Sequence, residues 1–138
     1  MEDRGVVLKK KLPASNIFIG NALELDFSNQ FDIVFQSTVF TSILDDDFRR
    51  KLAQKMYEMV KSKGMVLWYD FKYNNPYNSD VKGINRNEIK ELFPLSAKIE
   101  FYSVTLAPPI GRRIERIYNL VNFLFPFLRT HLIAIIYK

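Results

Sequence analysis

The sequence has no cysteine and only five glycines among its 138 residues. The absence of cysteine excludes a disulfide framework, a thiolate nucleophile and the common cysteine-ligated zinc sites, and it favours a reducing, cytoplasmic setting. The five glycines are scattered, and no two form the GxG turn that lets a backbone approach a nucleotide. We also predict no metal site, because the aspartates at 45–47 suit the positive end of a helix dipole.

Long uninterrupted hydrophobic runs are absent as well. Residues 6–8 are apolar, but lysines follow at once, so this run is too short for a secretion signal. The most apolar stretch, 117–137, is interrupted by Asn119, Asn122, Pro126 and Arg129. A membrane-spanning helix needs about 20 mostly apolar residues, so we predict no transmembrane helix.

The net charge of +5 is spread along the chain, with fifteen acidic residues among twenty basic ones. Nucleic-acid-binding modules gather basic residues beside stacking aromatics, whereas the aromatics here fall within apolar segments typical of a core. We therefore predict no nucleic-acid partner. A hydrophobic content of 48% in 138 residues indicates one folded domain.

Short strand-like and helix-like segments alternate along the chain. Three apolar runs, 16–22, 32–37 and 65–71, are typical of buried parallel strands. A 3- to 4-residue periodicity from 45 to 60 predicts a helix between the second and third runs. This alternation indicates an α/β layered fold. The remaining predictions are helices at 3–12, 87–92 and 110–128, the last broken near Pro126, and strands at 98–106 and 131–137.

Three of these segments together resemble the middle of the class I S-adenosylmethionine (SAM)-dependent methyltransferases. They are NIFIGNALELDF at 16–27, FDIVFQS at 31–37 and KGMVLWYD at 63–70, and their order and spacing match that family over about 55 positions. The segment YDFKYNNP at 69–76 is similar to those of methyltransferases from bacterial surface-glycan gene clusters.

The resemblance implies an incomplete Rossmann-like α/β sheet, mostly parallel with an antiparallel last strand and with helices on both faces. The first two strands and the glycine-rich turn of the family do not appear in this sequence. The strand at 16–22 then lacks its usual neighbour. It must pair directly with the strand at 32–37, have the gap filled by another chain, or belong to a fragment of marginal stability. We expect a single, truncated methyltransferase domain over 1–138.

The resemblance implies SAM as the cofactor and assigns two pairs of residues to it. Asn21 and Ala22 stand where the family presents the adenine edge, although the family more often has aspartate there. Gln36 and Ser37 end the next strand, beside the methionine part of the cofactor. A plain turn at a strand end is the alternative for Asn21.

The acceptor side of the family's site corresponds to two loops. An aromatic just before a helix is more often core, and a loop rich in asparagine and proline is often only a turn. Rings and amides also suit a sugar-like acceptor, through stacking and hydrogen bonds. The substrate-binding candidates are Phe40, Thr41, Tyr73, Asn74 and Asn75.

Methyl transfer needs at most one proton acceptor, because most of the catalysis comes from positioning the two reactants. For a hydroxyl acceptor the catalytic candidates are Asp70, at the end of a strand, and His131, the only histidine. His131 opens a predicted strand, which also suits a structural role.

We predict a SAM-dependent methyltransferase for a small-molecule or glycan acceptor, inactive as this chain alone because the glycine-rich cofactor motif is absent. One alternative is a non-catalytic module that binds a complementary subunit or forms an oligomer. Another is a membrane-surface protein, since Arg112, Arg113 and Arg116 precede a broad apolar face that suits either peripheral membrane contact or a helix covering the active site.

Overall fold

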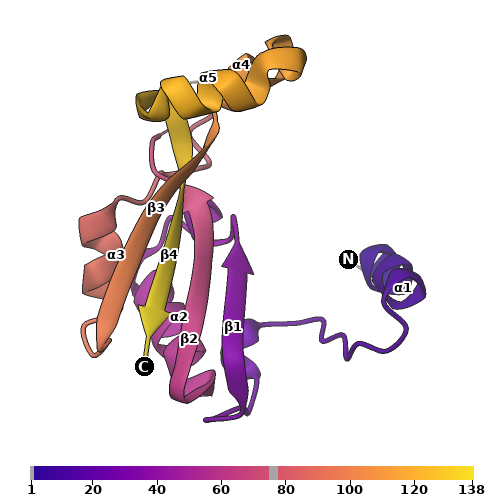
Figure 1. Cartoon of the computed structure of the whole chain (residues 1–138). Helices are drawn as coiled ribbons and strands as arrows, with labels where there is room; N and C mark the ends of the chain where they lie inside the picture. Colours follow the sequence, from indigo (N-terminus) through magenta and orange to yellow (C-terminus); the bar gives the residue numbers. More distant parts are fainter. Residues whose placement is uncertain (1, 75–77) are drawn as a thin grey trace.

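A four-stranded sheet organises the part of the chain that the computed structural model describes, residues 2–74 and 78–138 (Figure 1). The strands, in the order β1-β2-β4-β3, are β1 (Phe31–Ser37), β2 (Val60–Phe71), β3 (Lys98–Leu106) and β4 (Arg129–Tyr137). β1 runs parallel to β2, and β4 runs antiparallel to both β2 and β3. Three strands thus point one way and the last strand points the other, which confirms the predicted α/β sheet, mostly parallel with an antiparallel last strand.

The strand register brings apolar residues of neighbouring strands to one level of the sheet. Val66 of β2 pairs with Val34 of β1 and with Ile136 of β4. Alternate residues of a strand point to opposite faces, so Val66, Trp68 and Asp70 share one face. Each of these three side chains is at most 1% exposed.

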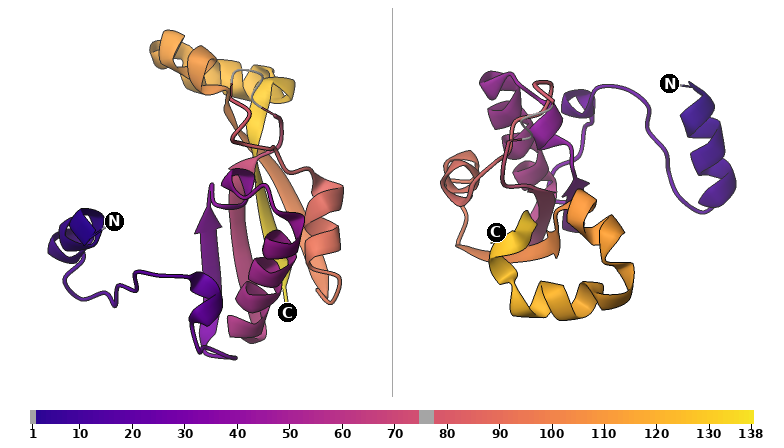
Figure 2. Two further views of the ribbon diagram at one scale, coloured as in Figure 1. Left: turned by 180° about the vertical axis from the view of Figure 1, so that it is seen from behind. Right: turned by 90° about the horizontal axis from the view of Figure 1, so that it is seen from above.

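Two helices cover this face (Figure 2). α2 (Asp46–Met59) is capped by Asp45, whose carboxylate accepts hydrogen bonds from two backbone N–H groups of the first turn. These bonds lower the pKa of the Asp45 carboxyl. α3 (Arg86–Leu92) begins with a capping box. The core under the helices consists of Phe40, Leu52, Ala53, Met56, Val60, Val66, Trp68, Ile84, Ile89, Phe93, Leu132, Ala134 and Ile136.

The other face of the sheet is open. Ile33 and Phe35 of β1 are 54% and 59% exposed, and no strand of the described chain pairs with the outer edge of β1. α1 (Glu2–Lys11) stands away from the sheet at the end of an extended segment (Figure 2). Its apolar residues are consecutive rather than spaced as a stripe, so it has no face to pack. The prediction of helices on both faces is therefore met on one face only.

The predicted strand at 16–22 is wrong. These residues are irregular and lead into the 3₁₀ helix η1 (Ala22–Glu24). A strand forms only where a neighbour takes up its backbone hydrogen bonds, and this segment has no such neighbour in the described sheet. Phe18 and Ile19 are consequently 61% and 58% exposed.

The segment predicted as one helix, 110–128, is an arch of short helical turns that crosses the end of the sheet (Figure 1). Proline fits the first turn of a helix but not its interior, so the helical stretch that ends at Leu124 is broken before Pro126. The other breaks fall at Ile114 and Ile117, where the backbone is not helical. We call residues 108–128 the arch. Its parts are α4 (Pro108–Arg113), η3 (Glu115–Ile117), α5 (Tyr118–Leu124) and η4 (Pro126–Leu128). The remaining predicted helices and strands are confirmed, with small differences in their bounds.

Replacement of Phe40 by alanine tests how much this one ring contributes to the stability of the core. Phe40 is fully buried, and its ring centroid lies 4.2 Å from that of Trp68. We expect Phe40→Ala to lower the free energy of unfolding by about 3–5 kcal/mol, because it leaves a cavity. Fluorescence of Trp68, the only tryptophan, reports unfolding in a urea titration. The control Phe123→Ala, at a position 76% exposed, should change it by less than about 0.5 kcal/mol; equal effects would contradict the assigned core.

Candidate functional site

The carboxyl ends of β1 and β2 lie side by side and form the kind of edge where α/β proteins bind ligands. Ser37 pairs with Tyr69 at this edge. The N–H of Thr38 donates to the Tyr69 carbonyl at 2.9 Å, and the chain turns at Thr38 with a φ of 55°. Apart from Asn21 and Ala22, the predicted site residues belong to this end of the sheet or to the loops that leave it.

Asp70 is a buried carboxylate that holds the loop after β1. It is 1% exposed. The backbone N–H groups of Phe40 and Thr41 donate to Oδ2 at 3.1 and 3.3 Å. The Thr41 hydroxyl donates to Oδ1 at 2.7 Å, and the N–H of Phe71 donates to Oδ1 at 3.0 Å. A buried carboxylate requires such partners, so the Asp70 oxygens are engaged in this network rather than open to an acceptor.

His131 points away from Asp70. The register pairs Asp70 with Leu132, so His131, the preceding residue, faces the opposite side of the sheet. Its ring stacks on Tyr69 with centroids 5.1 Å apart, and its Nδ1 lies 2.6 Å from the Thr105 hydroxyl oxygen. Burial lowers the pKa of His131, opposed by the charge of Asp70 and by a hydrogen bond to the backbone of Thr105. The two catalytic candidates therefore do not act as a pair.

Gln36 and Ser37 end β1 with different surroundings. Gln36 is buried; its amide donates to the Tyr69 carbonyl at 3.4 Å and accepts from the N–H of Val39 at 3.2 Å. The nitrogen and the oxygen of the Gln36 amide thus both hydrogen-bond to the backbone at this edge of the sheet. Ser37 is exposed and remains the member of the pair that is open to a ligand.

Phe40 and Thr41 form the 3₁₀ helix η2 (Phe40–Ser42) and point inward. Phe40 has no exposed surface and packs on Trp68, so the core alternative is the one that the structure supports. Thr41 is 2% exposed and is held by Asp70. The inward direction of both side chains follows from the Asp70 network, which the sequence does not reveal.

Asn21 and Ala22 lie in the irregular segment before β1, not at the end of a strand. The Asn21 Oδ1 accepts from the N–H of Leu23 at 3.1 Å and caps η1, and its amide group donates to Glu24 at 3.4 Å. The turn alternative therefore describes Asn21 as the structure has it. A shallow hollow of about 230 Å³ lies beside it, lined by residues 18–22, Glu24 and Leu25.

The loop after β2 closes on itself. The Asn74 Oδ1 accepts from the N–H of Gly83 at 2.9 Å. A Cβ at position 83 would collide with the Tyr73 backbone, so the close approach requires glycine. Asn75 lies outside the described residues. Tyr73 is 57% exposed and is the member of this group that is open to an acceptor.

A hollow of about 440 Å³ lies beside Tyr73. Two cationic side chains and no carboxylate line it, which suits a polar ligand that carries negative charge. Lys72 Nζ also lies 4.8 Å from the centroid of the Tyr73 ring. Lys72 directly precedes the predicted candidate Tyr73. Sequence reasoning missed Arg86 and Ser103, because they come from segments that only the fold brings beside this loop. The lining residues are Lys72, Tyr73, Asn85, Arg86, Asn87, Ser103 and Leu132.

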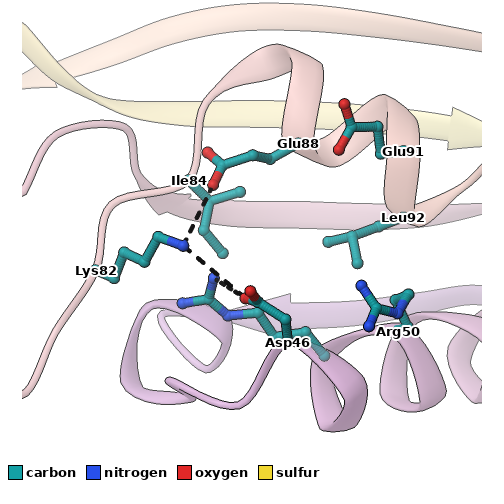
Figure 3. A pocket seen from close by; sticks show the side chains of 8 residues that line it. Asp46, Arg50, Lys82, Ile84, Glu88, Glu91 and Leu92 are labelled. Carbon is teal, nitrogen blue, oxygen red and sulfur yellow. Dashed lines mark hydrogen bonds and ion pairs between the residues drawn. The ribbon is translucent and has the colours of Figure 1, made fainter.

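A smaller hollow, of about 150 Å³, lies between α2 and α3 (Figure 3). Lys82 Nζ lies 3.9 Å from a carboxylate oxygen of both Asp46 and Glu88. The buried Arg49 has one nitrogen, Nη2, without a partner among the described residues, and the hollow has room for a water to satisfy it. Three cations and three carboxylates line this hollow: Arg49, Arg50 and Lys82, and Asp46, Glu88 and Glu91. Its balanced charge favours an ion-pair contact between the helices over a ligand site.

No group of three histidine, cysteine, aspartate or glutamate side chains in residues 2–74 and 78–138 is arranged to hold a metal ion.

The chain matches no protein-family model and no curated protein sequence, but its structure is similar to solved methyltransferases. A SAM-dependent methyltransferase from Archaeoglobus fulgidus matches with a TM-score of 0.66 and 13% identity, over 89% of this chain and 67% of that one. The N-methyltransferase NodS from Bradyrhizobium japonicum matches with a TM-score of 0.65 and 12% identity, over 100% of this chain and 69% of that one. The phosphoethanolamine N-methyltransferase 2 of Haemonchus contortus, in complex with S-adenosyl-L-methionine, matches with a TM-score of 0.56 and 20% identity, over 84% of this chain and 35% of that one.

These likenesses show that the chain has the fold of SAM-dependent methyltransferases. As far as the fold is concerned, this confirms the resemblance of residues 16–70 to SAM-dependent methyltransferases. This chain spans 35% to 69% of the lengths of the three structures. At such identities a shared fold does not decide the activity, which has to be argued from the site.

Removal of the Asp70 charge should release η2 from the sheet. We expect Asp70→Asn to lower the free energy of unfolding by about 2 kcal/mol or more, because an amide cannot accept all four hydrogen bonds of the buried carboxylate. Urea unfolding followed by Trp68 fluorescence measures the change. The exposed Asp26 provides the matched control, and Asp26→Asn should leave stability unaltered. If the Asp70→Asn variant were as stable as the wild type, the hydrogen bonds of Asp70 could not be what holds η2 on the sheet.

The lowered pKa of His131 makes stability depend on pH. The unfolded chain binds a proton near the ordinary value of 6.5, and the folded chain binds it only at lower pH. The contribution of His131 to the free energy of unfolding is therefore complete above its pKa in the unfolded chain, and it is lost as the pH falls through its pKa in the folded chain. We expect urea unfolding between pH 8 and pH 5 to show falling stability, and His131→Gln to flatten that slope. An unchanged slope in the variant would assign the effect to other groups.

Proposed function

We propose that this chain forms the acceptor-side part of a SAM-dependent methyltransferase that acts on a small polar molecule of the sugar class. The observation that carries the proposal is the strand order β1-β2-β4-β3 with a reversed β4, together with the structural likeness to SAM-dependent methyltransferases. This arrangement supports a ligand edge at the carboxyl ends of β1 and β2.

The described residues do not by themselves fit the cofactor. Asn21 is engaged in a cap, and both ends of the Gln36 amide fasten the sheet edge. No glycine-rich turn is present in the sequence to let a backbone approach the ligand. We therefore propose that cofactor binding requires a further polypeptide segment with a glycine-rich turn, placed along the outer edge of β1.

The open face of the sheet supports such a segment. The outer edge of β1 offers unpaired backbone groups, and Ile33 and Phe35 offer apolar surface beside it. Unpaired strand edges are ready templates for another strand. The occupant that fits both features is a strand followed by a helix: the strand extends the sheet and the helix covers Ile33 and Phe35.

The hollow beside Tyr73 supports a small hydroxylated acceptor. The exposed ring of Tyr73 offers a stacking surface. Lys72 and Arg86 favour a molecule with an anionic group, such as a sugar phosphate. Since the transfer of a methyl group depends chiefly on holding two reactants in line, the chain needs no free base. This agrees with the engaged Asp70 carboxylate.

A second candidate is a non-catalytic interaction module. The same unpaired β1 edge favours it, because an edge can serve to dock a partner without any chemistry. The two candidates differ in one property: only the first acquires cofactor affinity when its β1 edge is covered by a segment with a glycine-rich turn.

Calorimetric titration with S-adenosylhomocysteine tests the proposal in two steps. We expect this chain alone to show no binding at up to millimolar ligand, because it has no cofactor cradle. Micromolar binding, about 8 kcal/mol of affinity, would contradict the need for a further segment.

The second step uses a chimera that joins this chain to the third of the Archaeoglobus fulgidus methyltransferase that it does not match. We expect the folded chimera to bind S-adenosylhomocysteine in the micromolar range and Ser37→Trp to weaken that binding at least about tenfold, since a bulky ring would fill the ligand edge. The exposed Ser28, away from this edge, gives the matched control Ser28→Trp. A chimera that unfolds cooperatively in urea but does not bind would favour the interaction module.

A further inference from the structure

The arch presents a stripe of large apolar side chains to solvent. Leu120, Phe123, Leu124 and Phe127 are 57%, 76%, 53% and 70% exposed. Leu120, Phe123 and Leu124 are spaced by three or four residues, which places them on one side of α5. Phe127 follows in η4, and Ile117, just before α5, is 52% exposed. Scattered apolar residues need no explanation on a protein surface, but a contiguous group of this size marks an interaction site.

Hydrogen bonds hold the arch against the sheet, so loose packing of the arch does not explain why its apolar side chains are exposed. The Arg129 guanidinium donates to the Asn122 carbonyl at 2.8 Å, to the Asn122 Oδ1 at 3.2 Å and to the Ser103 carbonyl at 3.2 Å. The Tyr118 hydroxyl accepts from the N–H of Leu106 at 3.0 Å. These contacts use the inner side of α5 and leave the apolar stripe outside.

Positive charge accompanies the stripe. Arg112, Arg113 and Arg116 are exposed, and the sequence of the arch contains three arginines and one glutamate. The arch lies at one end of the molecule, beyond the sheet, where no other element stands in front of it (Figure 1). An apolar stripe beside cations at a protruding end is the arrangement of interfacial amphipathic segments.

We propose that the arch binds the surface of an anionic lipid bilayer. The phenylalanine and leucine side chains enter the boundary between headgroups and acyl chains, while Arg113 and Arg116 contact lipid phosphates. No helix in residues 2–74 and 78–138 is long and apolar enough to cross a membrane, so the contact is peripheral. This inference does not depend on the proposed methyltransferase activity, and it places the sheet edge beside lipid-borne molecules.

Vesicle flotation of the full chain tests the proposal. We expect the protein to float with vesicles of phosphatidylcholine and phosphatidylglycerol and to float far less with phosphatidylcholine alone. The double variant F123S/F127S should bind at least about tenfold less, because it removes two large apolar groups from the stripe. The double variant R113Q/R116Q should bind roughly 25-fold less, since each cation near an anionic surface contributes about fivefold.

Two controls make the result specific to the arch. Leu95→Ser removes an apolar side chain that is 81% exposed in the loop between α3 and β3, and it should leave binding unchanged. The triple variant K9Q/K10Q/K11Q removes the rival basic group on α1 and should leave most of the binding intact. Trp68 fluorescence and circular dichroism confirm that each variant is folded.

Several outcomes would overturn the proposal. One is the absence of flotation with anionic vesicles. Another is flotation that the folded F123S/F127S variant retains, which would indicate charge adsorption only. Loss of binding in the α1 variant but not in the arch variants would move the site to α1. A dimer in sedimentation velocity that F123S/F127S abolishes, without lipid binding, would assign the stripe to a second copy of the chain.

Discussion

The shape of the ligand edge depends on the hydrogen bonds that the buried carboxylate of Asp70 accepts. A charge in the core is tolerable only with hydrogen-bond donors on its oxygens, and here they come from η2 and from the backbone of β2. Because η2 directly follows the turn at the end of β1, this single group fixes the loop beside the candidate site. It also turns Phe40 and Thr41 inward, where they pack instead of contacting a ligand. The strand end thus has a structural anchor, and the exposed positions around it, Ser37 and Tyr73, are those that remain for recognition.

The second constraint is the asymmetry of the sheet. One face is closed by α2 and α3, whereas the other exposes Ile33 and Phe35 beside an unpaired strand edge. Apolar surface exposed to water costs free energy, and an unpaired strand edge is a ready template for another strand. A segment that extends the sheet and covers its face resolves both at once. This is the physical reason to treat cofactor binding as a property of a larger assembly of polypeptide.

The candidate site and the arch belong to the same end of the molecule. β3 and β4 carry the arch, and the strands β1 and β2 beside them carry the ligand edge (Figure 1). Arg129 links the arch to Ser103, which also lines the cationic hollow beside Tyr73. An arch seated on a lipid surface would bring that hollow close to anionic headgroups. The two proposals are physically compatible, although each stands on separate residues.

The sequence by itself determined the local features of this protein. The periodicity of 45–60, the alternation of 98–106 and the resemblance of 16–70 to methyltransferases rest on neighbouring residues, and α2, β3 and the fold agree with them. It could not determine what depends on partners distant in the chain. The apolar run at 16–22 stays irregular for want of a neighbouring strand, Asp70 is engaged by a loop that precedes it by about 30 residues, and Lys72, Arg86 and Ser103 share a hollow. Only tertiary structure decides these points, because pairing, burial and convergence are properties of the folded chain.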